Sequence, residues 1–230
     1  MSTQTATILQ PESLNEISLK QYQKFLTASE TLEGELLNHK MISLFCGMTL
    51  KESLMIKLTS VREIVNDINT LFEAEKPFQQ RFFIGKVEFG FIPNLQDMSF
   101  GEFIDLDTNL GDWQLMNRAM ATLYRPIIDE VGDKYEIEEY EGTDKYQEIM
   151  QFAPLGVVFG AVVFFWNLSN ALLKAIQSSL VEELVQEATQ EQSNLVKSGV
   201  GTQASMLSQQ ENLRELMKLL PMDLPNALPI

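Results

Sequence analysis

The chain has 230 residues, of which 45% are hydrophobic, and a formal net charge of −15 from 17 basic and 32 acidic residues. This length and composition suit one medium globular domain or two small ones, with enough apolar material for a core. A surface this negative repels phosphate, so we expect no nucleic-acid partner. The single cysteine, Cys46, excludes a disulfide within the chain.

The first third of the chain has the patterning of helices. After residues 1–13, which we expect to be disordered, apolar residues recur at three- and four-residue intervals through 14–76. The clearest stripe consists of Val61, Ile64, Val65, Ile68, Leu71 and Phe72. Pro77 ends this pattern, so residues 14–76 are predicted to form a helical unit.

Four pairs of residues have the spacing of a capping box, in which the two side chains satisfy free backbone donors at the start of a helix. They are Thr49 with Glu52, Ser60 with Glu63, Ser99 with Glu102, and Ser208 with Glu211. Each pair predicts a helix that begins next to its first residue. The second pair is expected to open the helix that carries the long apolar stripe.

A β-hairpin is predicted at residues 81–92. Apolar residues alternate with polar residues or glycine after the tight-turn pair Gly85-Lys86, and the apolar positions are Val87, Phe89 and Phe91. A two-residue turn followed by a period of two is typical of a half-buried strand that returns along its partner.

The hairpin belongs to a predicted α+β core at residues 77–190. A helical stripe runs from Trp113 to Tyr124 and ends at Arg125-Pro126, because a residue before proline disfavours the helix. Residues 134–138 are expected to form one more short strand. The predicted fold class is therefore α+β and mostly α, with a helical N-terminal unit, a small β-hairpin element and a long buried C-terminal helix.

The predicted C-terminal helix contains the least polar segment of the chain. No charged residue occurs between Glu148 and Lys174, and the stretch up to Trp166 is apolar on every helical face. Such a helix must be buried, in the core of the chain or at a subunit interface. Phe165 and Trp166 are the residues that we expect at such an interface.

A membrane-associated protein that uses helix 152–173 as a span is the alternative, because 25 uncharged residues are long enough to cross a bilayer. Asn167, Ser169 and Asn170 count against it, as does the lack of a flanking Lys/Arg cluster. Membrane insertion is therefore not the expected role. Gly156 and Gly160 have the GxxxG spacing that allows two helices to approach closely in either solvent.

Acidic residues concentrate between Asp129 and Glu148, where nine acids face only Lys134 and Lys145, a local net charge of −7. One interpretation is a docking face for a basic partner, and the other is a solvated hairpin and helix surface. The candidate contact residues on this face are Asp129, Glu130, Glu136, Glu138, Glu139 and Glu141.

The end of the chain is predicted to consist of a flexible linker, 191–205, and a tethered short helix and tail, 206–230. A helix of so few turns is marginal in water and is expected to fold only against a surface. It is a candidate for binding a neighbouring subunit, with a frayed tail as the alternative. Its apolar positions are Leu213, Leu216, Met217 and Leu220.

The residues give no indication of an enzyme. The only histidine, His39, precedes Cys46 by about two helical turns, roughly 10 Å of rise, which is beyond hydrogen-bond reach. The ligand count excludes a zinc site, and phosphate-binding glycine loops are absent. Glu102 and Asp105 could form a carboxylate pair for glycoside hydrolysis, but their spacing is ordinary for a helix. We therefore expect no catalytic residues, no cofactor and no metal site.

Several sequence blocks in fixed order resemble a known family. They are VEFGFIPNLQDMSFGEFIDLD (residues 87–107), WQLMNRAMATLYRPI (113–127), DKYEIEEYEG (133–142) and the helix VVFGAVVFFWNLSNALL (157–173). Together with the helical unit before them, they resemble a family of proteins encoded among the virion-assembly genes of tailed bacteriophages. The resemblance covers roughly residues 15–185 and lies in the order of the blocks rather than in one diagnostic motif.

This resemblance implies a non-enzymatic morphogenesis protein, either a virion component near the head–tail vertex or a tail-assembly chaperone. Its partners would be other virion or tail proteins, in a homo- or hetero-oligomer. It supplies no catalytic residues. The N-terminus lacks the basic start and apolar run of a signal peptide, so we expect the chain in the host cytoplasm during assembly, and in the virion if it is a structural component.

Overall fold

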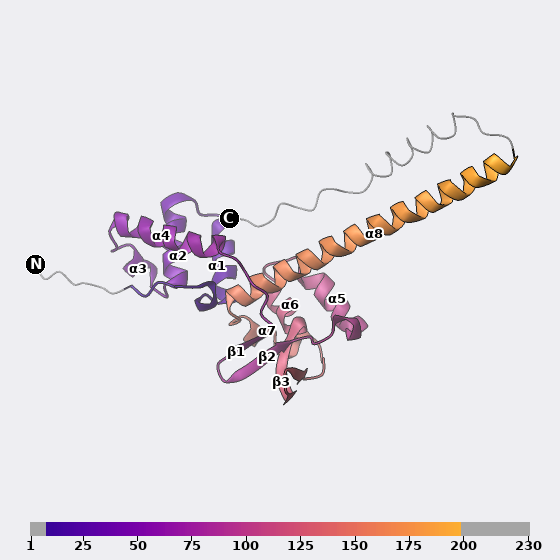
Figure 1. Cartoon of the computed structure of the whole chain (residues 1–230). Helices are drawn as coiled ribbons and strands as arrows, with labels where there is room; N and C mark the ends of the chain where they lie inside the picture. The colour runs from indigo at the N-terminus through magenta and orange to yellow at the C-terminus, as the bar shows by residue number, and fades with distance from the viewer. Residues whose placement is uncertain (1–7, 199–230) are drawn as a thin grey trace, which may run out of the picture. The chain divides into compact units, whose positions relative to one another are not determined.

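The structure is a computed structural model that describes residues 8–198, and it has an α+β fold (Figure 1). The described residues form two compact units, one ending at Trp166 and the other beginning at Asn167. Both predicted parts, the helical unit 14–76 and the core up to Trp166, belong to the first unit. Of the segment expected to be disordered, residues 1–7 lie outside the described part of the chain.

Helices make up most of the described chain. The α-helices are α1 (Leu19–Ser29), α2 (Gly34–Phe45), α3 (Leu50–Ser53), α4 (Leu58–Glu73), α5 (Phe100–Asn109), α6 (Met116–Leu123), α7 (Gln147–Met150) and α8 (Leu155–Ser198). Short 3₁₀ turns occur at Leu14–Glu16, Leu95–Asp97 and Thr143–Lys145.

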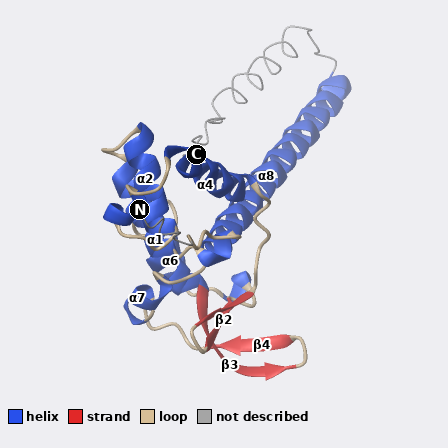
Figure 2. Cartoon of the chain, turned by 90° about the vertical axis from the view of Figure 1, so that its left-hand side faces the viewer, coloured by secondary structure: helices blue, strands red, loops and turns tan. Residues whose placement is uncertain are grey.

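An antiparallel sheet joins β1 (Arg81–Ile84), β2 (Val87–Phe91), β3 (Tyr124–Val131) and β4 (Lys134–Ile137) in the order β1-β2-β3-β4 (Figure 2). The predicted hairpin is the β1–β2 pair, closed by Ile84 opposite Val87. Gly85 and Gly132 each occupy the first position of a two-residue turn and have a positive φ. A positive φ at this position is the requirement of a type II′ turn. In the described chain, the other residues with positive φ are three further glycines.

Strand β3 was not predicted, although the short strand after it was. Its sequence YRPIIDEV contains Pro126 and two acids, and the alternation of apolar residues fails at Ile127 and Ile128. The structure shows the cause, a register irregularity between Ile127 and Asp129 in the pairing with β4. A bulge of this kind places one extra residue in the strand and breaks the period of two.

Two hydrophobic clusters lie on the two sides of the first turns of α8. One cluster joins α1, α2 and α4 and includes Leu155 and Phe159 of α8. The other joins the sheet with α5, α6 and α7 and includes Val157, Val158 and Ala161. All five residues are at most 3% exposed. A helix is apolar on every side when it is buried on every side, and this explains why the uncharged segment has no polar face in the first turns of α8.

Aromatic rings connect the two clusters. The ring centroid of Trp113 lies 5.1 Å from that of Tyr22 on α1 and 5.1 Å from that of Phe159 on α8. Trp113 packs against both clusters. Edge-to-face and tilted aromatic pairs of this kind contribute roughly 0.5–1.5 kcal/mol beyond their buried area.

Backbone hydrogen bonds also tie the start of α8 to the N-terminal helices. The amide of Leu19 donates to the carbonyl of Ala153 at 3.0 Å, and the amide of Leu155 donates to the carbonyl of Ile17 at 2.8 Å. Pro154 lies in the bridge between these bonds, opposite Ser18, and α8 begins at the residue after it.

The capping boxes form at two of the three predicted positions that the structure describes. Thr49 with Glu52 and Ser99 with Glu102 make both reciprocal hydrogen bonds. The box at Ser60 does not form, because α4 already begins at Leu58 with Lys57 as its N-cap. A box that was not predicted, Ser18 with Gln21, opens α1. The pair Ser208 with Glu211 lies outside the described residues.

The GxxxG glycines of α8 face other backbone and side chains rather than a second helix. A Cβ on Gly160 would lie 2.5 Å from the carbonyl oxygen of Pro77, whereas a Cβ on Gly156 would meet mainly the side chain of Asn15. The close approach that the GxxxG spacing allows is made at Gly160 by the backbone of Pro77 and Phe78. Gly160 thereby allows the chain entering the sheet to cross close to α8.

Burial along α8 decreases after Ala161. Residues 162–165 are partly exposed, Trp166 is 46% exposed and Leu168 is 44% exposed. The helix continues to Ser198, so residues 191–198, which were expected to begin the linker, are helical. The rest of the predicted linker and the tethered helix lie outside the described residues. The burial predicted for the long helix applies to its first turns.

We expect Gly160→Ala to lower the free energy of unfolding by about 1–2 kcal/mol, because the clash with backbone exceeds the gain of about 1 kcal/mol in helix propensity. Gly156→Ala is the matched control, since the Asn15 side chain can rotate away. Chemical denaturation of both variants measures the difference. Equal stability of the two variants would contradict the close approach at Pro77.

Candidate protein-binding surface

The acidic region predicted as a docking face begins on the β3–β4 hairpin. The hairpin starts in the core, and the part of it near the turn extends into solvent. Tyr124 and Arg125 at the start of β3 are buried, but every residue from Ile128 to Lys134 is exposed. Two of these are apolar, Ile128 at 63% and Val131 at 75% exposure. The hairpin tip therefore presents apolar side chains among carboxylates.

The two faces of this hairpin differ in their contacts. Asp129 lies directly opposite Glu136, and Val131 lies opposite Lys134. Like charges directly opposite each other destabilise an antiparallel pair. In the described chain neither Asp129 nor Glu136 forms a salt bridge. This face therefore has unbalanced negative charge available for a partner.

The opposite face of the hairpin is held against the sheet. Glu130 forms a salt bridge with Arg81 of β1 at 2.5 Å, and the Arg81 guanidinium lies 4.5 Å from the ring centroid of Tyr135. The Tyr135 hydroxyl donates to the carbonyl of Phe91 at 2.8 Å. Gly90 leaves room for the Tyr135 ring, which a Cβ at that position would meet. These contacts fix the direction in which the hairpin points.

The loop after β4 uses several of its acids internally. Lys145 lies between Glu138 at 2.9 Å and Glu141 at 2.7 Å. The Tyr146 hydroxyl also donates to Glu138, and hydrogen bonds from Tyr146 and Lys145 lower the pKa of that carboxyl. Burial and the bond to Glu138 raise the pKa of Tyr146 to about 12. Glu138 and Glu141 are thus partly neutralised.

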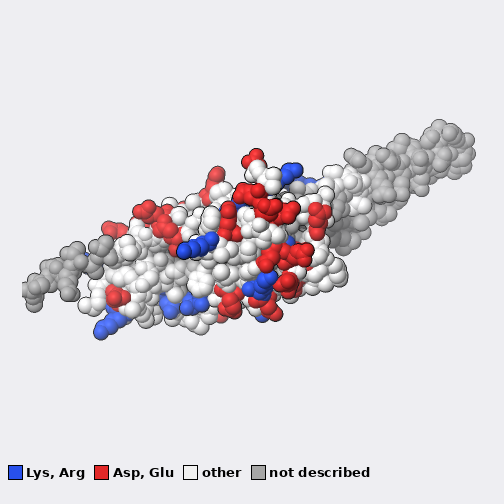
Figure 3. Space-filling view, turned by 90° about the horizontal axis from the view of Figure 1, so that it is seen from below, with Lys and Arg blue, Asp and Glu red and all other residues white. Residues whose placement is uncertain are grey.

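The predicted acidic residues therefore divide into two groups. Glu130, Glu138 and Glu141 have basic partners within the chain. In the described residues, no salt bridge is formed by the other three, which are Asp129, Glu136 and Glu139; Asp133, which was not among the predicted contact residues, forms none there either. Figure 3 shows the molecule from below the view of Figure 1, which is the side of the sheet. On this surface, acidic side chains predominate over basic ones.

A buried ion pair lies beneath this surface. Arg125 of β3 forms a salt bridge with Glu102 of α5, and the two side chains are only 9% and 7% exposed. Burial alone would raise the pKa of Glu102, but hydrogen bonds from Ser99 and Arg125 outweigh it and hold that pKa below its ordinary value. The Tyr140 hydroxyl donates to Asp105. Both acids considered for glycoside chemistry therefore accept hydrogen bonds from neighbouring side chains.

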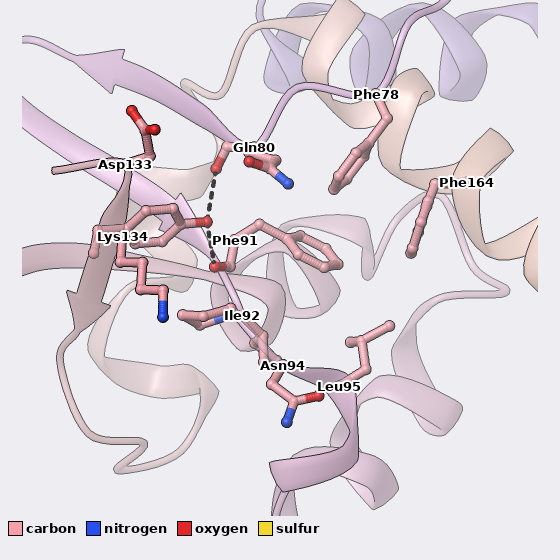
Figure 4. A pocket seen from close by; sticks show the side chains of 11 residues that line it. Phe78, Gln80, Phe91, Ile92, Asn94, Leu95, Asp133, Lys134 and Phe164 are labelled. Atoms are coloured by element: carbon pink, nitrogen blue, oxygen red, sulfur yellow. Dashed lines mark hydrogen bonds between the residues drawn. The ribbon is translucent and has the colours of Figure 1, made fainter.

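A cavity of about 660 Å³ opens beside the hairpin turn (Figure 4). Its apolar wall includes Phe78 and Phe164, whose rings stack with centroids 4.5 Å apart, and Phe91. Lys134 and Asp133 of the turn lie at its polar side. The cavity is within the size range of sites that accept a small molecule or a group of side chains.

The apolar candidates on α8 are in different environments. Phe165 is half-buried, with its ring 5.3 Å from Phe164 and 6.2 Å from Phe91. Trp166 is 46% exposed. The remaining candidates, Leu213, Leu216, Met217 and Leu220, lie outside the described residues.

An exposed apolar patch on α5 was missed. Phe100, Phe103 and Ile104 are 77%, 57% and 46% exposed, whereas Leu106 on the same helix is buried. The sequence did contain a signal for this patch, because α5 has apolar residues on more than one of its faces. A search for a single apolar stripe ignores the residues outside that stripe.

Comparisons of the chain with protein-family models, with curated protein sequences and with solved structures return no match. Among the helices whose side chains are described, none is long and apolar enough to cross a membrane. Within the same part of the chain, no cluster of three or more His, Cys, Asp or Glu side chains is placed to hold a metal ion.

We expect Glu102→Gln to lower the free energy of unfolding at neutral pH by about 3 kcal/mol, because it leaves the Arg125 charge buried without a partner. The pKa of Glu102 is lowered in the folded chain, so its stabilisation is present above the ordinary value of 4.5 and is lost as the pH falls through the folded value. The difference between wild type and variant should therefore shrink in acid.

Denaturation curves at a series of pH values measure this difference. The control is Glu35→Gln, which removes an exposed salt bridge to Arg62 and should change stability by less than about 1 kcal/mol. A Glu102→Gln effect as small as that of the control would contradict the role given to the buried pair.

Proposed function

We propose that this chain is a non-enzymatic bacteriophage morphogenesis protein that binds other virion or tail proteins. The observation that carries the proposal is the β3–β4 hairpin tip, where Ile128 and Val131 are largely exposed near Asp129 and Glu136, two carboxylates that form no salt bridge with any other described residue. The resemblance of residues 15–185 to proteins encoded among virion-assembly genes supports the biological setting.

The chemistry of the hairpin suits recognition of a basic surface. Apolar side chains provide affinity when they are removed from water, and unbalanced charge provides steering and partner selection. The hairpin needs little ordering on binding, because Arg81 and Tyr135 already hold its inner face. A preorganised element loses less conformational entropy when it binds.

The exposed aromatic patch on α5 supplies a second contact surface of the same kind. Phe100 and Phe103 lie on the helix that Glu102 fixes to β3 through Arg125. Contiguous exposed apolar residues on a soluble domain commonly mark protein contacts. A virion component or a tail-assembly chaperone would use both surfaces to bind partner chains.

Deletion of the gene from the phage that encodes it is expected to abolish infectious particles, with unjoined heads or tails accumulating. Complementation with the wild-type gene should restore them. The triple variant Asp133→Lys, Glu136→Lys and Glu139→Lys should reduce the yield at least about tenfold, because it reverses the charge that the partner recognises.

The matched control is Glu63→Lys, Glu73→Lys and Glu75→Lys, which makes the same change of charge at exposed positions on and after α4. It should complement like the wild type. Plaque counts and electron microscopy of lysates measure the outcome. Normal particle yield after gene deletion would overturn the proposed function.

A further inference from the structure

A second cavity, of about 730 Å³, lies between α1 and α2, and its charge is opposite to that of the hairpin. Lys20, Lys24 and Lys40 line this groove, and no acidic residue is among its lining residues. This is unusual in a chain with a net charge of −15. Within the described residues, none of the three lysines forms a salt bridge.

The polar groups of the groove other than the lysines already have partners. The Gln23 side-chain amide donates to the carbonyl of Trp113 at 2.8 Å, and that of Gln114 donates to the Thr27 hydroxyl at 3.2 Å. The groove also has apolar wall residues, Leu32 and Leu44 among them. It therefore suits an occupant that combines carboxylates with small apolar side chains.

The hairpin tip has that combination. Three of its carboxylates, those of Asp129, Asp133 and Glu136, form no salt bridge in the described part of the chain. Val131 is 75% exposed and lies directly opposite Lys134, while Asp129 lies opposite Glu136. These three acids would meet the three lysines of the groove, of which Lys20 also lies over the ring of Phe152 at 5.5 Å from its centroid. Val131 would meet the apolar wall. The groove volume suits the side chains of a hairpin tip rather than an entire domain.

The hairpin of one chain does not reach its own groove. Both lie in the unit that ends at Trp166, and Figures 1 and 2 show α1 and α2 apart from β3 in that unit. A second copy of the chain must therefore supply the hairpin. Two different surfaces would meet, which makes the interface heterologous, and repetition closes into a ring or continues as a filament.

We propose that the chain self-associates head to tail, with the β3–β4 hairpin of one copy in the Lys20–Lys24–Lys40 groove of the next. This inference rests on the proposed function, because it names a second copy of the chain as one partner of the acidic face. Assembly of this kind would display the exposed α5 patch of every copy along a ring or filament for other virion proteins.

Two variants of the full chain test the pairing. The groove variant is Lys24→Glu with Lys40→Glu. The hairpin variant is Asp129→Asn, Val131→Ser, Asp133→Asn and Glu136→Gln, which neutralises the tip so that it cannot bind either groove. All of these positions except Lys40 are exposed, and circular dichroism checks folding.

Sedimentation velocity and native mass spectrometry over a range of concentrations measure the assembly state. The wild type should form species larger than dimers at low salt, with an apparent Kd about tenfold higher when salt rises from about 50 to about 500 mM. Each variant alone should need about thirtyfold or higher concentration to associate, which is the effect of losing a central contact.

Mixing the two variants distinguishes a head-to-tail interface from any other. The hairpin variant retains a functional groove and the groove variant retains a functional hairpin, so the mixture should form a 1:1 complex. This complex should not grow further, because its two remaining surfaces are the altered ones. The control is Lys51→Glu with Lys57→Glu, which changes the charge equally at exposed positions outside the groove and should assemble like the wild type.

Three results would overturn the inference. They are a wild-type chain that remains monomeric at low salt, a groove or hairpin variant that assembles like the wild type, and a mixture that forms no complex. If the groove variant does not fold, the single change Lys24→Glu replaces it. A monomeric chain whose gene is still required for infectious particles would leave the proposed function in place and assign the acidic face to another protein.

Discussion

The first turns of α8 separate two hydrophobic clusters and thereby hold the helical and sheet parts of the chain together. Leu155 and Phe159 point into the helical cluster, while Val157, Val158 and Ala161 belong to the sheet cluster. A charge anywhere on these turns would be buried without solvent and would cost several kcal/mol. The absence of charge in this segment is therefore a requirement of its position between two cores.

The position of the acidic hairpin follows from this arrangement. β3 begins directly after α6 in the sheet cluster, with Tyr124 and Arg125 buried, and only its second half extends into solvent. Glu130 on the inner face of the hairpin is paired with Arg81, and Glu138 and Glu141 in the following loop are paired with Lys145. Asp129 and Glu136 lie opposite each other on the outer face and form no salt bridge within the described residues, so unbalanced negative charge remains on that face.

Local signals explain the elements that could be predicted. The β1–β2 hairpin depends on a two-residue turn with glycine, and the boxes at Thr49 and Ser99 depend on residues three positions apart. Strand β3 could not be predicted, because its bulge and Pro126 hide the period of two and because one of its two partners, β2, is distant in sequence. At Ser60 the local signal failed because α4 extends to Leu58.

The sequence by itself determined that the uncharged segment contains a buried helix, that the chain is acidic and that its acids concentrate between residues 129 and 148, because composition and periodicity are local properties. Only the tertiary structure decided what surrounds the segment, which carboxylates retain unbalanced charge, and that Lys20, Lys24 and Lys40 line one groove. The reason is physical. Burial, ion pairing and cavities depend on contacts between residues far apart in the chain, such as Arg81 with Glu130.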